Sequence, residues 1–307
     1  MAKHFLRRLA AAIPVLLGIV TVTFLVMHLL PGDPATAMLG FHVTEERAEA
    51  LREELGLNDP LAVQYVRYVG DAVRLDLGRS MSKRRPVHEL IIEQLPATIE
   101  LAVAGMGCAL IIGVVLGVLA ATHRGGWLDT GSMFVSLLGV SMPSFWFGLI
   151  LILVFSVQLR WVPILGIGGG LIRLILPAIA LGFRSAAMIA RLVRSSVLEV
   201  LRQDYIATAR AKGLREGAVV YKHALRNALI PVVTLMGLQF GRLLVGSVVI
   251  ENVFGREGIG TLLVGAIQVQ DIPVVQGVVL VTGFAYVLVN LLVDLSYTVL
   301  DPRVRFS

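Results

Sequence analysis

Residues 101–121 read LAVAGMGCALIIGVVLGVLAA and contain no acidic or basic side chain. About 20 apolar residues in a helix are long enough to cross the hydrocarbon core of a bilayer. Five further stretches of the chain are predominantly apolar over a similar length. They are residues 9–30, 133–157, 174–193, 229–250 and 274–298. The sequence therefore predicts an all-α polytopic membrane protein with six transmembrane helices.

The composition of the whole chain agrees with this assignment. Of its 307 residues, 56% are hydrophobic and 16% are charged, whereas an average soluble protein has about 25% charged residues. This balance excludes ordinary soluble, collagen-like and intrinsically disordered proteins. The single cysteine, Cys108, excludes an internal disulfide and a cysteine metal cluster, and we expect no metal site. The net charge of +6 is better explained by basic cytoplasmic loops than by nucleic-acid binding.

The distribution of lysine and arginine predicts the orientation in the membrane. If the N-terminus lies in the cytoplasm, the cytoplasmic segments hold 14 of these residues and the short outer segments hold three. The long segment after the first span is left out of this count, because long loops cross the membrane regardless of their charge. Basic residues accumulate in cytoplasmic loops, so both termini are expected on the cytoplasmic side.

The long outer segment, residues 31–95, has the signals of several short helices. Thr44 is expected to cap a helix that runs to Leu55, and apolar residues recur every fourth position over residues 61–73 and again after Pro86. Residues 259–267 place their apolar side chains on one helical face, and we expect this helix to lie flat at the outer membrane interface. The helices of the outer segment form either a solvated cap or a docking site for a partner protein.

The sequence lacks a recognisable set of catalytic residues. His88 and Glu89 begin like a zinc-protease helix, but Ile92 occupies the position of the second histidine. No Gly-Lys dipeptide occurs in the sequence, so the phosphate-binding loop of many ATP-hydrolysing proteins is missing. We therefore expect no enzymatic activity in this chain. If ATP drives the protein, another chain binds the nucleotide.

Three ionisable side chains fall inside predicted spans: Arg184, Arg242 and Asp294. An isolated charge at the centre of a membrane helix costs about 2.5–3.5 kcal/mol on insertion scales, so each of the three is a candidate functional residue. Asp294 is expected to pair with one of the arginines. The same charges keep open a second hypothesis, a self-contained secondary transporter or channel. A third hypothesis is a membrane scaffold without transport activity.

The most informative segment lies between the fourth and fifth predicted spans. It reads DYIATARAKGL over residues 204–214 and HALRNALIP over residues 223–231. This pattern predicts a short helix that ends at Gly213, followed by a second helix that leads into the next span. The small side chains of Ala207, Ala209 and Ala211 would let another protein approach the helix backbone closely. The alternative is an ordinary basic loop, but such a loop needs no ordered helices.

This segment resembles the cytoplasmic loop of permease subunits in binding-protein-dependent ABC importers. Ala207, Thr208, Ala209, Gly213 and Leu225 occupy positions of the family pattern, in which a glutamate stands where this chain has Ala207. Other short motifs, in chain order, resemble the peptide and nickel class of these importers, in its dipeptide, oligopeptide and glutathione branch. They are LPGDP at 30–34, QY at 64–65, DLG at 76–78, LPAT at 95–98, SMP at 141–143, VF at 253–254 and DPR at 301–303.

The resemblance implies the permease fold of a type I ABC importer in the bacterial inner membrane. Such a subunit pairs with a second homologous permease, sits on two cytoplasmic ATPase subunits and receives substrate from an extracytoplasmic solute-binding protein. It forms half of a translocation pathway for peptides and works by alternating access. The chain itself would hold no cofactor, because the ATPase subunits bind ATP and Mg. Dipeptides, oligopeptides, glutathione and nickel remain open as substrates.

The resemblance also implies a division of the chain and a coupling site. Residues 1–94 would form the first span and the outer helical segment, and residues 95–300 the transporter domain with a coupling loop near 199–228. Residues 301–307 would form a cytoplasmic tail. The residues expected to couple this loop to the ATPase are Asp204, Tyr205, Ala207, Ala209, Ala211, Lys212, Gly213 and Leu214.

Overall fold

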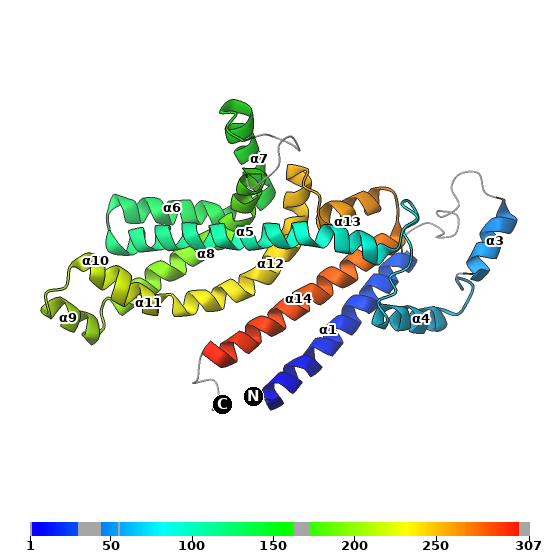
Figure 1. Cartoon of the computed structure of the whole chain (residues 1–307), viewed down its shortest axis with the longest axis horizontal. Helices are drawn as coiled ribbons and strands as arrows, with labels where there is room; N and C mark the ends of the chain where they lie inside the picture. The colour runs from blue at the N-terminus through cyan, green and yellow to red at the C-terminus, as the bar shows by residue number, and fades with distance from the viewer. Residues whose placement is uncertain (1, 30–43, 55, 163–171, 301–307) are drawn as a thin grey trace. The chain divides into compact units, whose positions relative to one another are not determined.

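Helices dominate the computed structural model, which describes residues 2–29, 44–54, 56–162 and 172–300 (Figure 1). The elements, with η for a π-helical segment, are α1 Ala2–Leu29, α3 Glu45–Glu54, α4 Leu61–Val73, α5 Val87–Thr122, α6 Trp127–Ser141, α7 Ser144–Leu151, η1 Ile152–Gln158, α8 Ile172–Val200, α9 Asp204–Ala211, α10 Glu216–Ala218, η2 Val219–Ala224, α11 Leu225–Ala228, α12 Ile230–Phe254, α13 Ile259–Gln268 and α14 Ile272–Leu300. The described ranges contain no β-strand, only an isolated bridge between Arg79 and Pro86. The predicted all-α fold class is confirmed. The motif at 30–34 and the tail at 301–307 lie outside the described residues.

Four helices are long and apolar enough to cross a membrane: α5, α8, α12 and, as far as Val293, α14. The bent pair formed by α6 with α7 and η1 is a fifth candidate. For α1, the apolar part that can be assessed is Ala10–Leu25, which is shorter than a full span. Within the described residues, length and composition therefore support four or five of the six predicted spans.

The third predicted span, residues 133–157, is not one continuous helix. α6 ends at Ser141, α7 begins at Ser144, and the two segments meet at 114°. A proline drives the residue before it out of the α-helical region, and Met142, which precedes Pro143, is extended with φ −84° and ψ 133°. Met142 and Pro143 therefore end the first helix and produce a sharp bend between α6 and α7.

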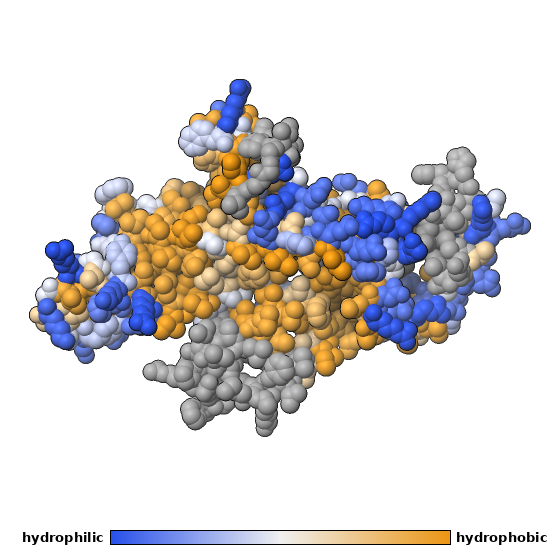
Figure 2. Space-filling model, viewed as in Figure 1, coloured by the Kyte–Doolittle hydropathy of each residue, from blue (hydrophilic) through white to orange (hydrophobic). Residues whose placement is uncertain are grey.

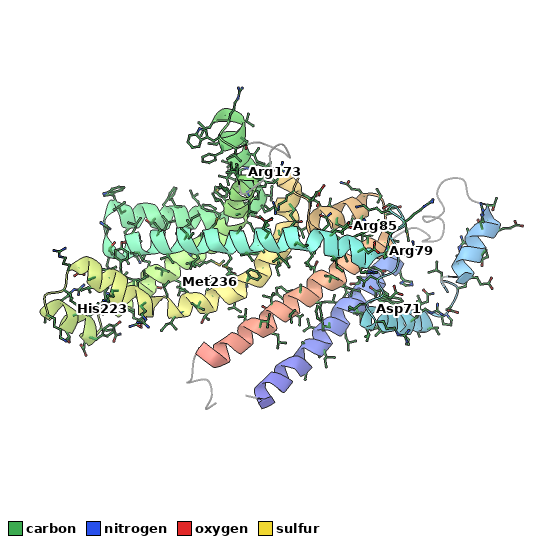
Figure 3. All side chains as sticks on the ribbon, in the orientation of Figure 1. Asp71, Arg79, Arg85, Arg173, His223 and Met236 are labelled. Atoms are coloured by element: carbon green, nitrogen blue, oxygen red, sulfur yellow. The ribbon has the colours of Figure 1, made fainter. Side chains whose placement is uncertain are left out.

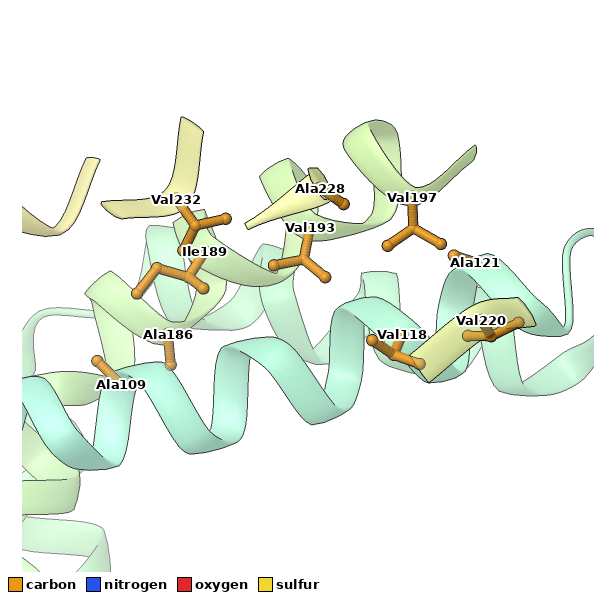
Figure 4. Close-up of a cluster of buried hydrophobic side chains, with 10 residues drawn as sticks. All are labelled: Ala109, Val118, Ala121, Ala186, Ile189, Val193, Val197, Val220, Ala228 and Val232. Carbon is orange, nitrogen blue, oxygen red and sulfur yellow. The ribbon is translucent and has the colours of Figure 1, made fainter. Parts of the chain in front are cut away.

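The chain divides into two compact units. The first unit contains Met1–Thr98 and Glu257–Leu291, and the second contains Ile99–Arg256 and Leu292–Ser307. The second unit is built around α8, which packs against α6, α7 and α12. Its core, drawn in Figure 4, combines side chains of α5, α8 and the segments before and within α12. The buried residues of this core are Ala109, Val118, Ala121, Ala186, Ile189, Val193, Val197, Val220, Ala228 and Val232.

Helices α5 and α8 approach each other closely where both carry small residues. A Cβ atom on Gly182 of α8 would lie 2.3 Å from the carbonyl oxygen of Gly105 on α5. A Cβ atom on Gly117 of α5 would lie 2.6 Å from the carbonyl oxygen of Ala190 on α8. Small residues allow the two helices to approach so closely. In a bilayer the lipid is as apolar as the side chains, so the hydrophobic effect does not drive helices together, and van der Waals contact of this kind stabilises their packing.

The core of the first unit joins the beginning of α5 to α13 and α14. Its buried residues are Val87, Leu90, Ile91, Ile259, Leu262, Ala266, Val274 and Val278. The predicted helix at 259–267 is confirmed as α13, but most of its apolar face packs into this core. α5 and α14 cover most of this face, and Ile267 stays exposed. The position of α13 at the outer membrane interface stays a prediction.

The helix predicted after Pro86 and the second predicted span form one continuous helix, α5, which includes Pro96. A proline inside a helix removes a backbone donor and costs about 3 kcal/mol. Val87, Leu90 and Ile91, which precede Pro96, are all buried in the core of the first unit. Burial of each such side chain contributes about 1.5–3 kcal/mol, which offsets the cost of the proline and keeps the helix intact.

The other short helices of the outer segment are also present. α3 begins after Thr44 and ends at Glu54, close to the predicted bounds. α4 lies along α1, where Thr21 Oγ1 and Tyr65 Oη are 2.7 Å apart. The ring of Phe24 on α1 packs edge-on against Tyr65, with 5.3 Å between the ring centroids. α4 therefore packs against the first helix of the chain, α1, and is not a free-standing solvated helix.

Asp271 fastens the segment around the Arg79–Pro86 bridge to the beginning of α14. Its carboxylate accepts hydrogen bonds from Ser80 Oγ at 2.6 Å, from Ser82 Oγ at 2.7 Å and from the backbone N–H groups of Met81 and Ser82 at 3.1 and 3.0 Å. Burial by itself raises the pKa of this carboxyl. The hydrogen bonds from Ser80, Ser82 and Met81 together outweigh the burial and hold the pKa of Asp271 below its ordinary value.

We expect Gly182→Val to destabilise the protein by about 1–3 kcal/mol or more, because the new side chain collides with the backbone of α5. Gly131→Val on α6 is the matched control, since a Cβ atom there meets nothing within 4 Å. Thermal unfolding of the purified proteins in detergent measures the difference. Equal midpoints for the two variants would contradict the close approach of α5 and α8.

The hydrogen bonds to Asp271 predict a pH-dependent contribution to stability. Because the folded-state pKa is lowered, the contribution is complete above the unfolded-state pKa of about 3.9 and disappears as the pH falls through the folded-state pKa. Asp271→Asn should therefore be less stable than the wild type at pH 7, and the difference should shrink as the pH falls below about 4. Denaturation at a series of pH values tests this, and a difference that stays constant with pH would argue against an ionised Asp271.

Candidate functional site

The loop between α8 and α12 folds into a set of short helices over a small core of its own. α9 begins at Asp204, whose carboxylate lies in the first turn, where it interacts favourably with the helix dipole. Below α9, Ile206 and Ala209 pack against Val219 and Ala224 of η2. Val200 and Leu201, at the end of α8, complete this cluster. The position of α9 is therefore fixed by packing and not only by its two ends.

Gly213 ends α9 in a conformation that few other residues adopt. Its φ is +77°, in the left-handed region that favours glycine. The N–H of Gly213 donates to the carbonyl of Arg210 at 2.9 Å, and the N–H of Leu214 donates to the carbonyl of Ala209 at 3.4 Å. These two hydrogen bonds form a Schellman motif, which satisfies carbonyls at the helix end and turns the chain toward α10.

Two side-chain contacts tie α9 to the segments that follow it. Arg210 forms a two-pronged ion pair with Glu216 of α10, with Nη2–Oε1 and Nε–Oε2 distances of 2.6 and 3.1 Å. The Arg210 guanidinium lowers the pKa of the Glu216 carboxyl through these hydrogen bonds. Asn227 Nδ2 of α11 donates to the hydroxyl oxygen of Tyr205 at 2.7 Å. Since only Leu229 separates α11 from α12, the second contact connects α9 to the base of a membrane-spanning helix.

The predicted coupling residues divide into an exposed group and one buried residue. The exposed residues are Asp204, Tyr205, Ala207, Ala211, Lys212, Gly213 and Leu214. Ala209 is only 7% exposed and belongs to the small core below α9, so the expectation that it shares the outer surface with Ala207 and Ala211 is wrong. Figure 2 shows that charged side chains gather at α9 and α10, whereas apolar side chains gather over α5, α6 and α8 of the same unit. His223 of η2, labelled in Figure 3, is half-buried in the segment that packs on α9.

Two of the three intramembrane candidates are exposed side chains of the second unit. Arg184 lies on α8 and Arg242 on α12. Arg242 Nη1 donates to Gln239 Oε1 at 3.2 Å, and Gln239 Nε2 in turn contacts the sulfur of Met188 on α8 at 2.8 Å. Asp294 lies outside the residues whose side chains the structure describes, so its pairing with an arginine stays a prediction.

Comparison with protein families identifies the chain. Residues 113–306 match the family described as the binding-protein-dependent transport system inner membrane component. Residues 1–102 match the family of its N-terminal region. The chain belongs to this family. It is thus a multi-pass permease of the inner membrane, and the resemblance inferred from the loop at 204–231 is confirmed.

Several relatives match this permease over the full length of both chains. A protein of Brucella abortus that is named as a peptide transport system permease is 46% identical. The glutathione transport system permease protein of Pectobacterium atrosepticum and the dipeptide transport system permease protein of Alkalihalophilus pseudofirmus are each 44% identical. These are the names of peptide, glutathione and dipeptide permeases, the branch that the sequence motifs resemble.

Two solved transporters share the fold of the permease. An inward-facing structure of the MetNI methionine ABC transporter matches 69% of this chain and 96% of its own, with a TM-score of 0.56 and 20% identity. An amino acid ABC transporter crystallised with histidines matches 70% of this chain and 94% of its own, with a TM-score of 0.51 and 14% identity. The predicted type I importer fold is confirmed by these likenesses.

The structure of the permease also shows an ion pair that the sequence did not reveal. Asp129, in the first turn of α6, is buried and accepts hydrogen bonds from Arg194 Nε at 2.7 Å and Arg194 Nη2 at 2.8 Å. The N–H of Gly125 donates to the same carboxylate at 3.0 Å. The sequence separates the two partners by 65 residues, and Arg194 entered the sequence analysis only as one of the 14 basic residues that predict the orientation. The pair fastens the beginning of α6 to α8 at Arg194, less than two turns before α8 ends at Val200.

We expect Asp129 and Arg194 to show a coupling energy of about 0.5–3 kcal/mol in a double-mutant cycle. Asp129→Asn alone leaves the Arg194 guanidinium without its anion, and Arg194→Gln alone leaves the buried carboxylate unpaired, so the double variant should lose less than the sum. Chemical denaturation of the four proteins in detergent gives the energies. Strictly additive losses would show that the pair does not connect α6 to α8.

Proposed function

We propose that the chain forms half of the translocation pathway of an ATP-driven peptide importer and that α9 docks on a cytoplasmic ATPase subunit. The observation that carries the docking proposal is the construction of the loop. α9 has a core of its own beneath it, a glycine-dependent turn at its end and contacts to α10 and α11. Its outer surface, with Ala207, Ala211 and Lys212, remains exposed. A loop without a partner would need none of this internal order.

The partners follow from the same proposal. The second half of the pathway is a homologous permease, and two ATPase subunits bind and hydrolyse ATP with Mg. An extracytoplasmic solute-binding protein delivers the substrate, which is a dipeptide, an oligopeptide or a glutathione-like peptide. Both termini and the α9 loop lie on the cytoplasmic side, as the excess of basic residues in those segments favours. The names of the relatives support the peptide class.

Alternating access requires that ATP binding changes the relative free energy of two states of the permease. A partner can shift such an equilibrium only if it binds one state more tightly than the other. If the ATPase subunits hold α9 differently in their ATP-bound and free states, the Tyr205–Asn227 contact transmits that difference to α11. Only Leu229 separates α11 from α12, so a displacement of the loop reaches a membrane-spanning helix directly.

Gly213→Pro is expected to abolish the substrate-stimulated ATP hydrolysis of the assembled transporter while leaving the permease inserted in the membrane. Proline fixes φ near −65°, which is incompatible with the φ of +77°, and it removes the N–H that donates to Arg210. Gly213→Ala should have an intermediate effect, because the left-handed conformation costs an alanine about 1–2 kcal/mol. Co-purification of the ATPase should fall in parallel.

Gly217→Ala is the matched control for both variants. Gly217 lies four residues further along the same loop, its φ is not positive and a Cβ atom there meets nothing within 4 Å. Its ATP hydrolysis should equal that of the wild type. Normal stimulation in the Gly213→Pro transporter would refute the docking role of the α9 turn.

A further inference from the structure

Two contacts define how α8 and α12 lie against each other. The sulfur of Met188 on α8 meets Gln239 Nε2 on α12, and Leu181, two turns earlier on α8, lies 3.4 Å from the position of a Cβ atom on Gly246. The residue number falls by seven on one helix as it rises by seven on the other, so the helices are antiparallel. Between these two contacts lie Arg184 on α8 and Arg242 on α12. The register therefore places the two arginines at nearly the same level of the helix pair.

This level is deep inside both candidate spans. Arg242 is 12 residues from each end of α12, and Arg184 is 12 residues from the beginning of α8 and 16 from its end. At 1.5 Å per residue the nearest helix ends are about 18 Å away. An arginine side chain that starts at such a depth cannot bring its charge to the membrane surface by snorkelling as those near helix ends do.

Most N–H donors of the Arg184 and Arg242 guanidinium groups have no hydrogen-bond partner among the described residues. Both side chains are exposed on the surface of this unit. Within the part of the chain that the structure describes, Arg184 makes no hydrogen bond or ion pair, and the only such contact of Arg242 is the one from Nη1 to Gln239. Gln239 is 3% exposed, and its contact with Met188 orients its oxygen toward Arg242. The chain thus positions Arg242 and leaves most of its donors open.

The surface of α8 around Arg184 is not of the kind that faces lipid. Arg184, Met188, Arg191 and Ser195 recur at helical spacing and share one face, on which all but the half-buried Met188 are exposed. The opposite face, with Ala186, Ile189 and Val193, is buried in the core of the unit. Charged residues inside membrane helices face a bundle interior or a water-filled cavity. This face therefore borders either the translocation pathway or another subunit.

We infer that Arg184 and Arg242 form a binding site, halfway across the membrane, for a carboxylate of the transported peptide. This inference rests on the proposed function and identifies the part of the substrate that the permease recognises. Two guanidinium groups at one level offer paired donors to the planar carboxylate, the geometry for which arginine is best suited. A peptide with a free C-terminus always presents such a group, whatever its side chains. Arg191 lies on the same face of α8, two turns closer to the α9 loop, and has no counterpart on α12 in this site.

The test uses the complete transporter in proteoliposomes, with the binding protein supplied already loaded. The two substrates are a dipeptide with a free C-terminal carboxylate and the same dipeptide with an amidated C-terminus. Arg184→Gln and Arg242→Gln should each lower uptake of the free dipeptide about tenfold, as expected for loss of a hydrogen bond to a charged group. They should leave uptake of the amidated dipeptide unchanged. Stimulation of ATP hydrolysis by the loaded binding protein should persist, because the α9 loop is intact.

Two sets of variants control for charge and for folding. Arg191→Gln removes a positive charge from the same face two turns away, and it should affect the two dipeptides equally. Arg184→Lys and Arg242→Lys keep the charge but lose the guanidinium fork, so they should assemble normally and show an intermediate preference for the free dipeptide. Size-exclusion chromatography of each complex reports whether assembly is complete.

Three outcomes would overturn the inference. Unchanged uptake of the free dipeptide by both glutamine variants would show that the arginines do not bind it. Dissociation of the complex in the glutamine variants would show that the arginines pair with an acidic residue of the partner permease instead. A wild-type transporter without uptake or stimulated ATP hydrolysis would refute the proposed function itself, and with it this site. The wild type therefore distinguishes failure of the proposed function from the first two outcomes, which concern the variants alone.

Discussion

The close approach of α5 and α8 is the contact on which the second unit depends. Where the carbonyl of Gly105 faces Gly182, no side chain fits between the helices, and the same is true about three turns further along, where Gly117 faces the carbonyl of Ala190. In a bilayer the attraction between helices comes from such packing, since lipid is as apolar as leucine. The contact buries one face of α8 completely, and it thereby determines which face of α8 remains available for polar residues.

α8 consequently has two roles, and its sequence places the residues for each role on a different face of the helix. Its inner face supplies Ile189, Val193 and Val197 to the core, and its outer face carries Arg184, Arg191 and Ser195. Arg194 lies between the two and reaches Asp129. At its end, Val200 and Leu201 become part of the small core under α9. One rigid helix thus links Arg184, inside a candidate span, to the α9 loop, and a rigid element of this kind can pass a displacement from one end to the other.

Periodicity and local turn signals predicted the parts of the structure that depend on interactions between residues close together in the sequence. Gly213 as the end of α9, Thr44 before α3 and the apolar face of α13 all follow from a few neighbouring residues. The failures involve contacts that are distant in sequence or competing effects. The helical stretch after Pro86 and the span at 101–121 were predicted as separate elements, but burial of the residues before Pro96 keeps them in one helix, α5. Met142 and Pro143, in contrast, interrupt the third predicted span. The partnership of Asp129 with Arg194 and the burial of Ala209 depend on packing that no local pattern encodes.

The break at Met142 and Pro143 has a practical consequence for spectroscopy. All three tryptophans of the chain, Trp127, Trp146 and Trp161, lie in or directly beside the bent pair of helices around this break. Trp127 and Trp161 are largely exposed, and the ring of Trp161 lies 5.7 Å from that of Phe155. The tryptophan fluorescence of the protein, excited apart from that of its six tyrosines, is therefore a local signal. A change in tryptophan emission wavelength during a transport cycle would report on the surroundings of these bent helices.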